Sequence, residues 1–541
     1  MSIVRSLHTR VMQKQHLFAI AVTTAVVLAL IRTTTGQSNG TIARIDTGLI
    51  EGVAADGVLS FKGVPYAAPP LGRFRWRRPQ FATPWQGVRQ ASAFGAECLQ
   101  KPMPGDPAAS ARAFDEDCLF LNVWRPAADS GEALPVLVWI HGGGFLTGGS
   151  SAPVFDGSVL ARQGLVVVSM NYRLGRLGFF MHPALTSTGE AEPGNYGFLD
   201  QLAALQWVRR NIEAFGGDHR QVTIAGESAG GISVMHFLTW SPARSLFARA
   251  VVMSGGGRTY LIANTGATTF ASAERAGLAF ARSVGIMGTD ASTLAALRAL
   301  PAARISSDLG IEALTTKPDT YAGGPILDGT VVITMPGHVL QRHAAANVPI
   351  LIGTTSDDLP VLFPPKTNPL SFFGANAPAA KAVYFTDHAD MTTAINKIAV
   401  DMTMHEPARF VARQMTAAGQ PAWLYRFGYV AESLRPKTAG AAQATELPYL
   451  FGTLNARYGR TATPNDRKMA DTFMGYVAAF ARTGDPNRSG LPPWPRYDTG
   501  NSKLMMFTTD GDAIVQADPW KARLDMIEYA VESRTSTTTF P

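Results

Sequence analysis

Short runs of mostly apolar residues recur along the chain, each of a length typical of a buried strand. They occupy residues 136–140, 165–170, 222–225, 250–253, 349–353 and 422–425. Most lack the regular alternation of apolar and polar residues that marks a strand with one face in water. We therefore expect these runs to form a central sheet that is covered on both faces.

Between the second and third of these runs, apolar residues recur at the spacing of a helix. Leu205, Val208, Ile212 and Phe215 form one apolar stripe, as expected of a helix that packs on a core. Strands that alternate with helices predict a mostly parallel sheet with helices on both faces. Residues 258–320 and 370–418 are rich in alanine and helical spacing, and we expect them to form helical cap insertions.

The first 36 residues differ from the rest of the chain. Arg5, Arg10 and Lys14 precede an apolar run at residues 17–31, and small and polar residues follow. A membrane span needs about 20 apolar residues, so the pattern favours a cleavable signal peptide over residues 1–36 and export to the periplasm or medium. An uncleaved anchor is the alternative, because Arg32 directly follows the run. We expect no stable membrane anchor once the leader is removed.

Composition and charge narrow the class of protein further. The chain has 541 residues, of which 46% are hydrophobic and only 16% charged, which excludes a disordered protein. The net charge of +7 includes four basic residues of the leader, and no stripe of Lys and Arg with interleaved aromatics indicates nucleic acid. In an oxidising compartment Cys98 and Cys118 can form a disulfide; two buried free thiols are the alternative.

The clearest chemical motif is GESAG at residues 226–230. It directly follows the strand predicted at 222–225 and precedes residues compatible with a helix. In this context G-x-S-x-G predicts a sharp strand-to-helix turn that exposes the Ser228 hydroxyl as a nucleophile. The alternative, a plain Gly-Ser turn, leaves the surrounding strand and helix pattern unexplained.

A second motif, HGGGF at residues 141–145, follows the strand predicted at 136–140. Consecutive glycines let backbone N–H groups approach a developing oxyanion without a side chain in the way. We expect Gly143, Gly144 and the N–H of Ala229 to form an oxyanion hole. His141 is a candidate base, but a packing role that holds the shape of the loop is favoured.

With these motifs the chain resembles the type-B carboxylesterases, the α/β-hydrolase family that includes the cholinesterases. The resemblance is also carried by residues 61–70, 116–123, 171–175 and 194–201. It implies an α/β-hydrolase fold with one catalytic domain over residues 37–532. The mostly polar residues SRTSTTTFP at 533–541 predict a flexible tail after it. The resemblance further implies a small-molecule ester substrate and a disulfide between Cys98 and Cys118. No motif indicates a cofactor or a metal site.

The resemblance also implies where the catalytic acid lies. The family pattern is close to G-T-N-x-D-E-G, and this chain has GTTSDDL at residues 353–359. Asp358 therefore takes the acid position, with Asp in place of Glu, and either carboxylate can orient a base. Asp357 is the competing candidate, and a solvated loop position for both is the third alternative.

The chain departs from the family at the general base. The family has G-A-x-H-x-x-E-L/I, and residues 440–447 are GAAQATEL, so Gln443 stands where the histidine belongs. A carboxamide cannot take a proton from a serine hydroxyl. No histidine follows His405, and His236 lies about 12 Å along the helix that follows Ser228. The others outside the leader have no pattern that indicates a base: His182, His219, His338, His343, His388 and His405.

Two functions from different classes follow. The first is a serine carboxylesterase that works through an acyl-enzyme and is impaired by Gln443. Among family members it resembles the fumonisin esterases, which release tricarballylic acid. A broad-specificity esterase or lipase is the competing activity. The second is a non-catalytic ligand-binding or adhesion protein on the same fold. Loss of catalysis without constraint erodes several elements, whereas here one residue differs, and this favours the esterase.

Overall fold

The computed structural model describes residues 40–103, 112–128, 131–189, 194–258, 269–317, 319–358, 369–385, 391–438 and 440–535. The predicted signal peptide therefore lies outside the described residues. The first three residues of the predicted tail, 533–535, belong to the last helix, α18 (Lys521–Thr535), and the rest of the tail lies outside. Within the described ranges, no helix is both long and apolar enough to cross a membrane.

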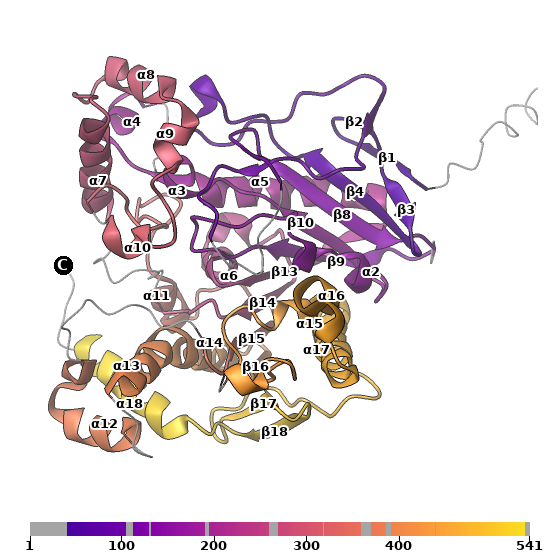
Figure 1. Ribbon diagram of the computed structural model, residues 1–541, viewed down its shortest axis with the longest axis vertical. Coiled ribbons are helices and arrows are strands. Elements are labelled where there is room, and N and C mark those ends of the chain that lie inside the picture. Colours follow the sequence, from indigo (N-terminus) through magenta and orange to yellow (C-terminus); the bar gives the residue numbers. More distant parts are fainter. Residues whose placement is uncertain are drawn as a thin grey trace, which may run out of the picture.

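An eleven-stranded sheet forms the centre of the molecule (Figure 1). Its spatial order is β18-β17-β16-β15-β14-β13-β9-β10-β8-β4-β3. The strands from β17 to β10 pair in parallel, and the pairs toward both edges are antiparallel. This confirms the α/β-hydrolase fold with a mostly parallel sheet. The strands are β3 (Val53–Ala55), β4 (Val58–Pro65), β8 (Phe120–Pro126), β9 (Leu134–Ile140), β10 (Val166–Met170), β13 (Gly217–Glu227), β14 (Arg249–Met253), β15 (Ile350–Thr355), β16 (Ala422–Phe427), β17 (Lys503–Phe507) and β18 (Ala513–Ala517).

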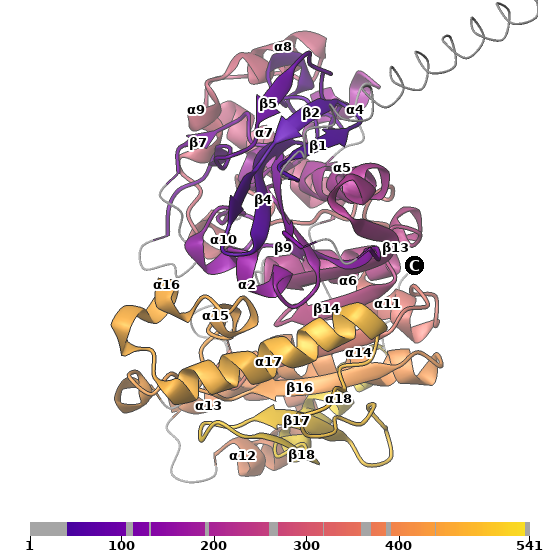
Figure 2. The ribbon, with the colours of Figure 1, turned by 90° about the vertical axis from the view of Figure 1, so that its right-hand side faces the viewer.

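The two faces of the sheet carry separate cores. In β9, Val136, Val138 and Ile140 pack into one core, and Leu137 and Trp139 into the other, because successive side chains of a strand point to opposite faces. Helices α5 (Tyr196–Asn211), α6 (Ala229–Thr239) and α14 (Glu406–Ala417) cover the first face. Helices α2 (Ser158–Ala161), α15 (Leu447–Leu450) and α17 (Pro464–Thr483) cover the second; Figure 2 shows α17 running along it.

The helix predicted from the apolar stripe ends earlier than the stripe does. Helix α5 ends at Asn211, and Ile212 and Phe215 belong to a 3-10 turn, η3 (Ile212–Phe215), that Gly216 closes with a φ of 72°. All four stripe residues are buried. The stripe thus predicted the buried face correctly, although the chain tightens over its last turn.

Both predicted insertions are helical. The first contains α7 (Phe270–Ser283), α8 (Ala291–Ala299), α9 (Ala302–Ser306) and α10 (Ala313–Thr316). The second contains η5 (Pro369–Asn376), α12 (Ala377–Tyr384), α13 (Met391–Val400) and the π-helix η6 (Asp401–His405), and it leads into α14. Figure 1 shows the two groups on its left. Helix α14 packs against β15 and β16, so the second range also supplies a layer of the central domain.

The N-terminal part adds small sheets beside the main one. Strands β1 (Ile42–Ile45), β2 (Gly48–Glu51) and β5 (Val88–Gln90) form one of them. Strands β6 (Glu97–Cys98) and β7 (Phe114–Asp115) form another, next to the disulfide between Cys98 and Cys118. A cross-link over 20 residues stabilises the fold by about 3 kcal/mol in the chain-entropy description.

Candidate active site

Ser228 lies at the sharp turn between β13 and α6. Its backbone has φ 55° and ψ −122°, a region that costs a residue with a side chain about 1–3 kcal/mol unless its surroundings enforce it. Here the Ser228 N–H donates to the Met253 carbonyl over 2.9 Å, and the Ser228 carbonyl accepts from the Ile232 N–H over 2.8 Å. These bonds connect the turn to β14 on one side and to the first turn of α6 on the other.

The glycines on either side of Ser228 allow the close packing of this turn. A Cβ on Gly230 would lie 2.0 Å from the Ile140 carbonyl oxygen, and a Cβ on Gly226 would lie 2.5 Å from the carbonyl of Gly230. Any other residue would therefore separate α6 from the ends of β9 and β13. The turn sits at the carboxyl end of a parallel strand, where open α/β sheets form their sites.

The glycine-rich loop after β9 faces the same turn. Gly143 and Gly144 have φ values of 100° and 62°, and the Gly143 carbonyl accepts from the N–H groups of Leu146 and Thr147, each over 3.0 Å. The N–H groups of Gly143, Gly144 and Ala229 donate no hydrogen bond to another described residue. Such free N–H groups are what a negatively charged oxygen requires.

His141 is part of this loop's packing. Its ring stacks on Tyr172 with 4.4 Å between the centroids, and its Nδ1 lies 2.9 Å from the Gly142 carbonyl oxygen. The Tyr172 hydroxyl donates to the His141 carbonyl over 2.8 Å. Burial lowers the pKa of His141 to about 4, so the ring is neutral at pH 7 and these contacts hold the start of the loop.

The acid candidates after β15 lie in different surroundings. Asp358 is 1% exposed, and its Oδ2 accepts from the Ser254 hydroxyl over 2.6 Å and from the Thr355 N–H over 3.1 Å. Asp357 is exposed, and its N–H donates to the Ala441 carbonyl over 2.8 Å. Only Asp358 therefore turns its carboxylate into the interior of the site.

Ser254 is a site residue that the sequence analysis missed. It directly follows β14, has a φ of 45° and is fully buried. Because Met253 beside it accepts the hydrogen bond from the Ser228 N–H, Ser254 links the turn to Asp358. Its position directly after a buried strand, at the sheet edge that carries Ser228, is the signal that could have identified it.

Gln443 lies in the loop next to the acid. The isolated bridge between Asp357 and Ala442 joins the two loops, and the Ala441 N–H donates to the Ser356 hydroxyl over 2.9 Å. Gln443 is partly buried, and its Nε2 makes no hydrogen bond to the residues that the structure describes. The structure therefore brings Gln443 to the neighbourhood of Asp358 without giving its amide a partner there.

Two further carboxyl groups lie in this part of the molecule. Glu446 is fully buried, and burial together with the negative charge of Asp358 raises its pKa to about 8. Glu227, the residue before Ser228, is 4% exposed. Burial and the charges of Glu446, Asp358 and Glu227 raise the pKa of the Tyr425 phenol. The three acids thus act electrostatically on one buried phenol, although only Asp358 had been predicted to act in the site.

Two of the other described histidines, His236 and His405, are buried among structural partners. His236 stacks on Phe198 with 4.1 Å between the centroids, and burial lowers its pKa to about 3. His405 has its Nδ1 2.8 Å from the Thr354 hydroxyl, and burial and the charges of Arg426 and Arg523 hold its pKa well below the usual range. His388 is not among the described residues.

Three more histidines, one of them buried, also have local contacts. His182 caps α4 (Pro183–Ser187) by accepting from the Ala184 N–H, and His219 lies 2.8 Å from Glu213. His338 lies 3.2 Å from the Thr334 hydroxyl. In the described part of the chain, no group of three or more His, Cys, Asp or Glu residues is arranged to hold a metal ion.

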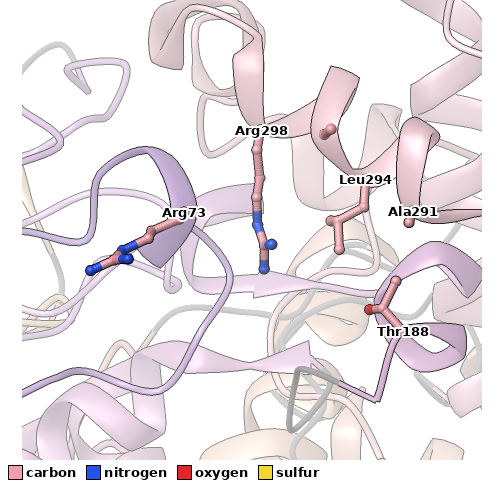
Figure 3. Close-up of a pocket in the computed structure, with 6 residues that line it drawn as sticks. Arg73, Thr188, Ala291, Leu294 and Arg298 are labelled. Atoms are coloured by element: carbon pink, nitrogen blue, oxygen red, sulfur yellow. The ribbon is translucent and has the colours of Figure 1, made fainter.

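A cavity of about 350 Å³ lies elsewhere, between the turn η1 (Gly72–Phe74) and α8 (Figure 3). Arg298 points into it, whereas the guanidinium of Arg73 points away from Arg298 (Figure 3). Thr188 and Leu294 line it as well. None of the predicted site residues lines this cavity.

Comparison with known proteins places the chain in a family. The profile of the carboxylesterase family matches residues 39–370 and 375–524. The chain is 34% identical over 488 residues to a fumonisin B1 esterase of Sphingopyxis macrogoltabida, covering 86% of each chain. It is also 34% identical to the para-nitrobenzyl esterase of Bacillus subtilis (strain 168), with 87% of this chain and 95% of that relative covered. A solved PNB esterase structure superposes with a TM-score of 0.76 at 31% identity, covering 90% of this chain and 99% of that one. The chain therefore belongs to the carboxylesterase family.

Proposed function

We propose that the chain is an exported serine carboxylesterase in which Ser228 is the nucleophile and Asp358 the acid of the triad. The proposal rests on one observation, that three features lie together at one edge of the sheet. These are the strained Ser228 turn, the N–H groups of Gly143, Gly144 and Ala229 that bond to no other described residue, and the buried Asp358 carboxylate that Ser254 connects to the turn. A carboxylesterase needs a nucleophile, an oxyanion hole and an oriented base, and the first two features support the first two roles.

The chemistry follows from this arrangement. The Ser228 Oγ loses its proton and forms a bond to the ester carbonyl carbon, while the carbonyl π electrons move to the oxygen. The three N–H groups stabilise that oxyanion, and each such donor lowers the activation free energy by about 3–4 kcal/mol. Collapse of the tetrahedral intermediate breaks the bond to the alcohol and leaves an acyl-enzyme. Water then repeats the sequence and releases the acid.

Gln443 impairs both proton transfers in this proposal. The base removes the Ser228 proton and returns a proton to the leaving alcohol, and an amide side chain has no pKa near the working pH. Neither His141 nor His236 replaces it, because their pKa values lie at about 4 and about 3 and both rings are fully engaged in packing. The position of Gln443 in the loop beside Asp358 is the place from which a histidine would act.

The substrate we propose is an ester of a polycarboxylic acid, of the kind that a fumonisin B1 esterase acts on. The 34% identity to that enzyme over most of both chains supports it. The equal identity to a para-nitrobenzyl esterase makes a simple aryl ester the appropriate comparison substrate. We further propose that the protein is exported, since the leader pattern and the disulfide between Cys98 and Cys118 suit an oxidising compartment.

The test is the Gln443→His variant beside the unmodified chain, assayed with p-nitrophenyl butyrate and with a tricarballylate diester. Loss of a triad histidine costs about 10⁶ in turnover in a serine protease. We therefore expect Gln443→His to raise kcat by at least about a thousandfold with little change in Tm. Adding Ser228→Ala should abolish the gain. A flat rate in the folded variant contradicts the triad assignment, and a flat rate that Ser228→Ala also leaves unchanged favours a ligand-binding protein on this fold.

A further inference from the structure

Glu227 lies next to the nucleophile both in sequence and in space. A Cβ built on Gly142 would lie 2.7 Å from the Glu227 Oε2 and 3.1 Å from the Ser228 Cβ. The carboxylate of Glu227 and the side chain of Ser228 therefore both approach Gly142, at the start of the glycine-rich loop. Glu227 is only 4% exposed, so its carboxylate belongs to the interior of the site and not to the surface.

These two contacts limit the separation of the carboxylate and the serine side chain. The Glu227 Oε2 and the Ser228 Cβ lie 2.7 Å and 3.1 Å from one point, and are therefore at most about 6 Å apart. One bridging water joins polar atoms at about this separation. A carboxylate at that distance from the serine has the placement that a proton acceptor needs, acting through one water.

We propose that Glu227 accepts the Ser228 proton in this chain, in the role that the missing histidine would have. This inference rests on the proposed function, since it assigns a base to the same acyl transfer. Buried carboxylates serve as general bases in other enzymes when they lie beside the proton that they remove. Glu227 would thereby give the chain a slower esterase activity that does not need position 443.

The steps balance without another reactant. The Ser228 Oγ–H bond breaks, the proton moves to a Glu227 carboxylate oxygen, and the freed Oγ forms the bond to the substrate carbonyl carbon. When the bond to the alcohol breaks, the proton returns from the Glu227 carboxyl to the alkoxide. Deacylation uses the same carboxylate to take a proton from the attacking water and returns it to the Ser228 Oγ.

The other two acids are less suited to this role. The Asp358 Oδ2 is bound by the Ser254 hydroxyl and the Thr355 N–H. Glu446 has both carboxyl oxygens buried without a hydrogen bond from another described residue, and its pKa of about 8 keeps it protonated at pH 7. Glu446 lies three residues from Gln443 and is therefore a matched control, a buried carboxyl of the same cluster without the contact to the Gly142 position.

The experiment is a double-mutant cycle on the full chain. Glu227→Gln is made in the unmodified chain and in the Gln443→His variant, and the burst of p-nitrophenolate from p-nitrophenyl butyrate is followed. This leaving group departs as an anion, so the burst reports removal of the Ser228 proton and not its return. We expect Glu227→Gln to slow the burst by at least about a hundredfold in the unmodified chain and by less than about tenfold in the Gln443→His background.

Two companion variants complete the test. Glu446→Gln should change the burst rate by less than about threefold in both backgrounds. Glu227→Asp keeps the carboxylate on a shorter arm and should give a rate between those of the unmodified chain and Glu227→Gln, which separates loss of the proton acceptor from loss of folding. Near-UV circular dichroism and Tm, neither of which depends on a base, check that each variant retains the packed fold.

The outcomes separate this inference from the proposed function. If Gln443→His speeds the enzyme but Glu227→Gln has the same effect in both backgrounds, Glu227 is not the base and the esterase proposal stands. If Ser228→Ala leaves the rate of the unmodified chain unchanged, both proposals fall. A flat Gln443→His variant together with a hundredfold loss in Glu227→Gln would support Glu227 and remove only the assignment of position 443.

Discussion

The two halves of the candidate site are positioned by different kinds of contact. The Ser228 turn and the glycine-rich loop are shaped by backbone hydrogen bonds, positive φ values and glycines that admit close approach. The half that contains Asp358 and Gln443 depends on side chains, namely one short hydrogen bond from Ser254 to Asp358 and a buried Gln443 Nε2 that bonds to no other described residue. A change of one side chain can therefore remove the function of the second half while the first keeps its geometry.

This difference suits a chain that carries Gln443. Backbone preorganisation supplies the electrostatic part of catalysis, whereas proton transfer requires a titratable side chain. The proposed role of the first half needs no histidine, and in the second the nearest alternatives are the buried carboxyl groups. Variants of Asp358 and of position 443 should therefore change the rate steeply, and variants in the first half should change both rate and stability.

The largest effect should come from the acid. In the Gln443→His background, we expect Asp358→Asn to lower kcat by about 10⁴, because the imidazole loses the carboxylate that orients it and stabilises its cation. Asp357→Asn, one residue away but exposed, should change kcat by less than about threefold. Steady-state kinetics on p-nitrophenyl butyrate decides between them. Equal losses would show that the wrong carboxylate has been assigned to the triad.

The same contrast explains what could be predicted from the sequence. The turn at Ser228 and the loop at Gly143 were found because their geometry requires glycine and serine at fixed spacing within one short segment. All six predicted strands were found because burial on both faces leaves an apolar run. Glu227 and Ser254 were missed because their role depends on which residues meet across the ends of separate strands, and spacing within a segment does not encode that.

The two predicted insertions, residues 258–320 and 370–418, show the same limit of sequence patterns, which do not predict the packing partner of a segment. Alanine content predicted helices in both ranges, and helices are present. The pattern could not tell that α14 packs against β15 and β16, because amphipathic spacing reports that a face is buried and not which partner covers it.

The next largest effect tests the backbone half. A Cβ on Gly143 would lie 2.1 Å from the Thr147 carbonyl oxygen, at a φ of 100° that side chains rarely adopt. Gly143→Ala should therefore displace an oxyanion donor and lower kcat by about 10²–10³, with a lower Tm. Gly164→Ala is the matched control, since Gly164 has a φ of 82° but nothing within 4 Å. It should lower Tm slightly without changing kcat; a similar loss of rate in both variants would point to a general effect of backbone strain.

A smaller effect is expected at the link between the two halves. Ser254→Ala removes the 2.6 Å hydrogen bond to Asp358, and a hydrogen bond to a charged group contributes about 1.5–3 kcal/mol. In the Gln443→His background we expect kcat to fall about tenfold, because Asp358 keeps the N–H of Thr355 as a donor. Ser254→Cys, which retains a weak donor, should lie between. An unchanged rate would mean that Ser254 supports the fold and not the acid.

The smallest effect on rate, with a distinct effect on stability, is expected at Glu446. Its pKa rises from an ordinary 4.5 to about 8 in the folded protein, so the folded state holds a proton that the unfolded chain releases. Below pH 4.5 both states are protonated and the group costs nothing. As the pH rises toward 8, only the unfolded chain ionises at this residue, and the free energy of unfolding falls by on the order of 4 kcal/mol.

The variant Glu446→Gln tests this linkage. Its side chain does not titrate, so its Tm should match that of the unmodified chain at pH 4.5 and exceed it by a few degrees at pH 8. Thermal unfolding at several pH values measures this difference, and a Tm difference that is the same at every pH would show that Glu446 is ionised in the folded protein.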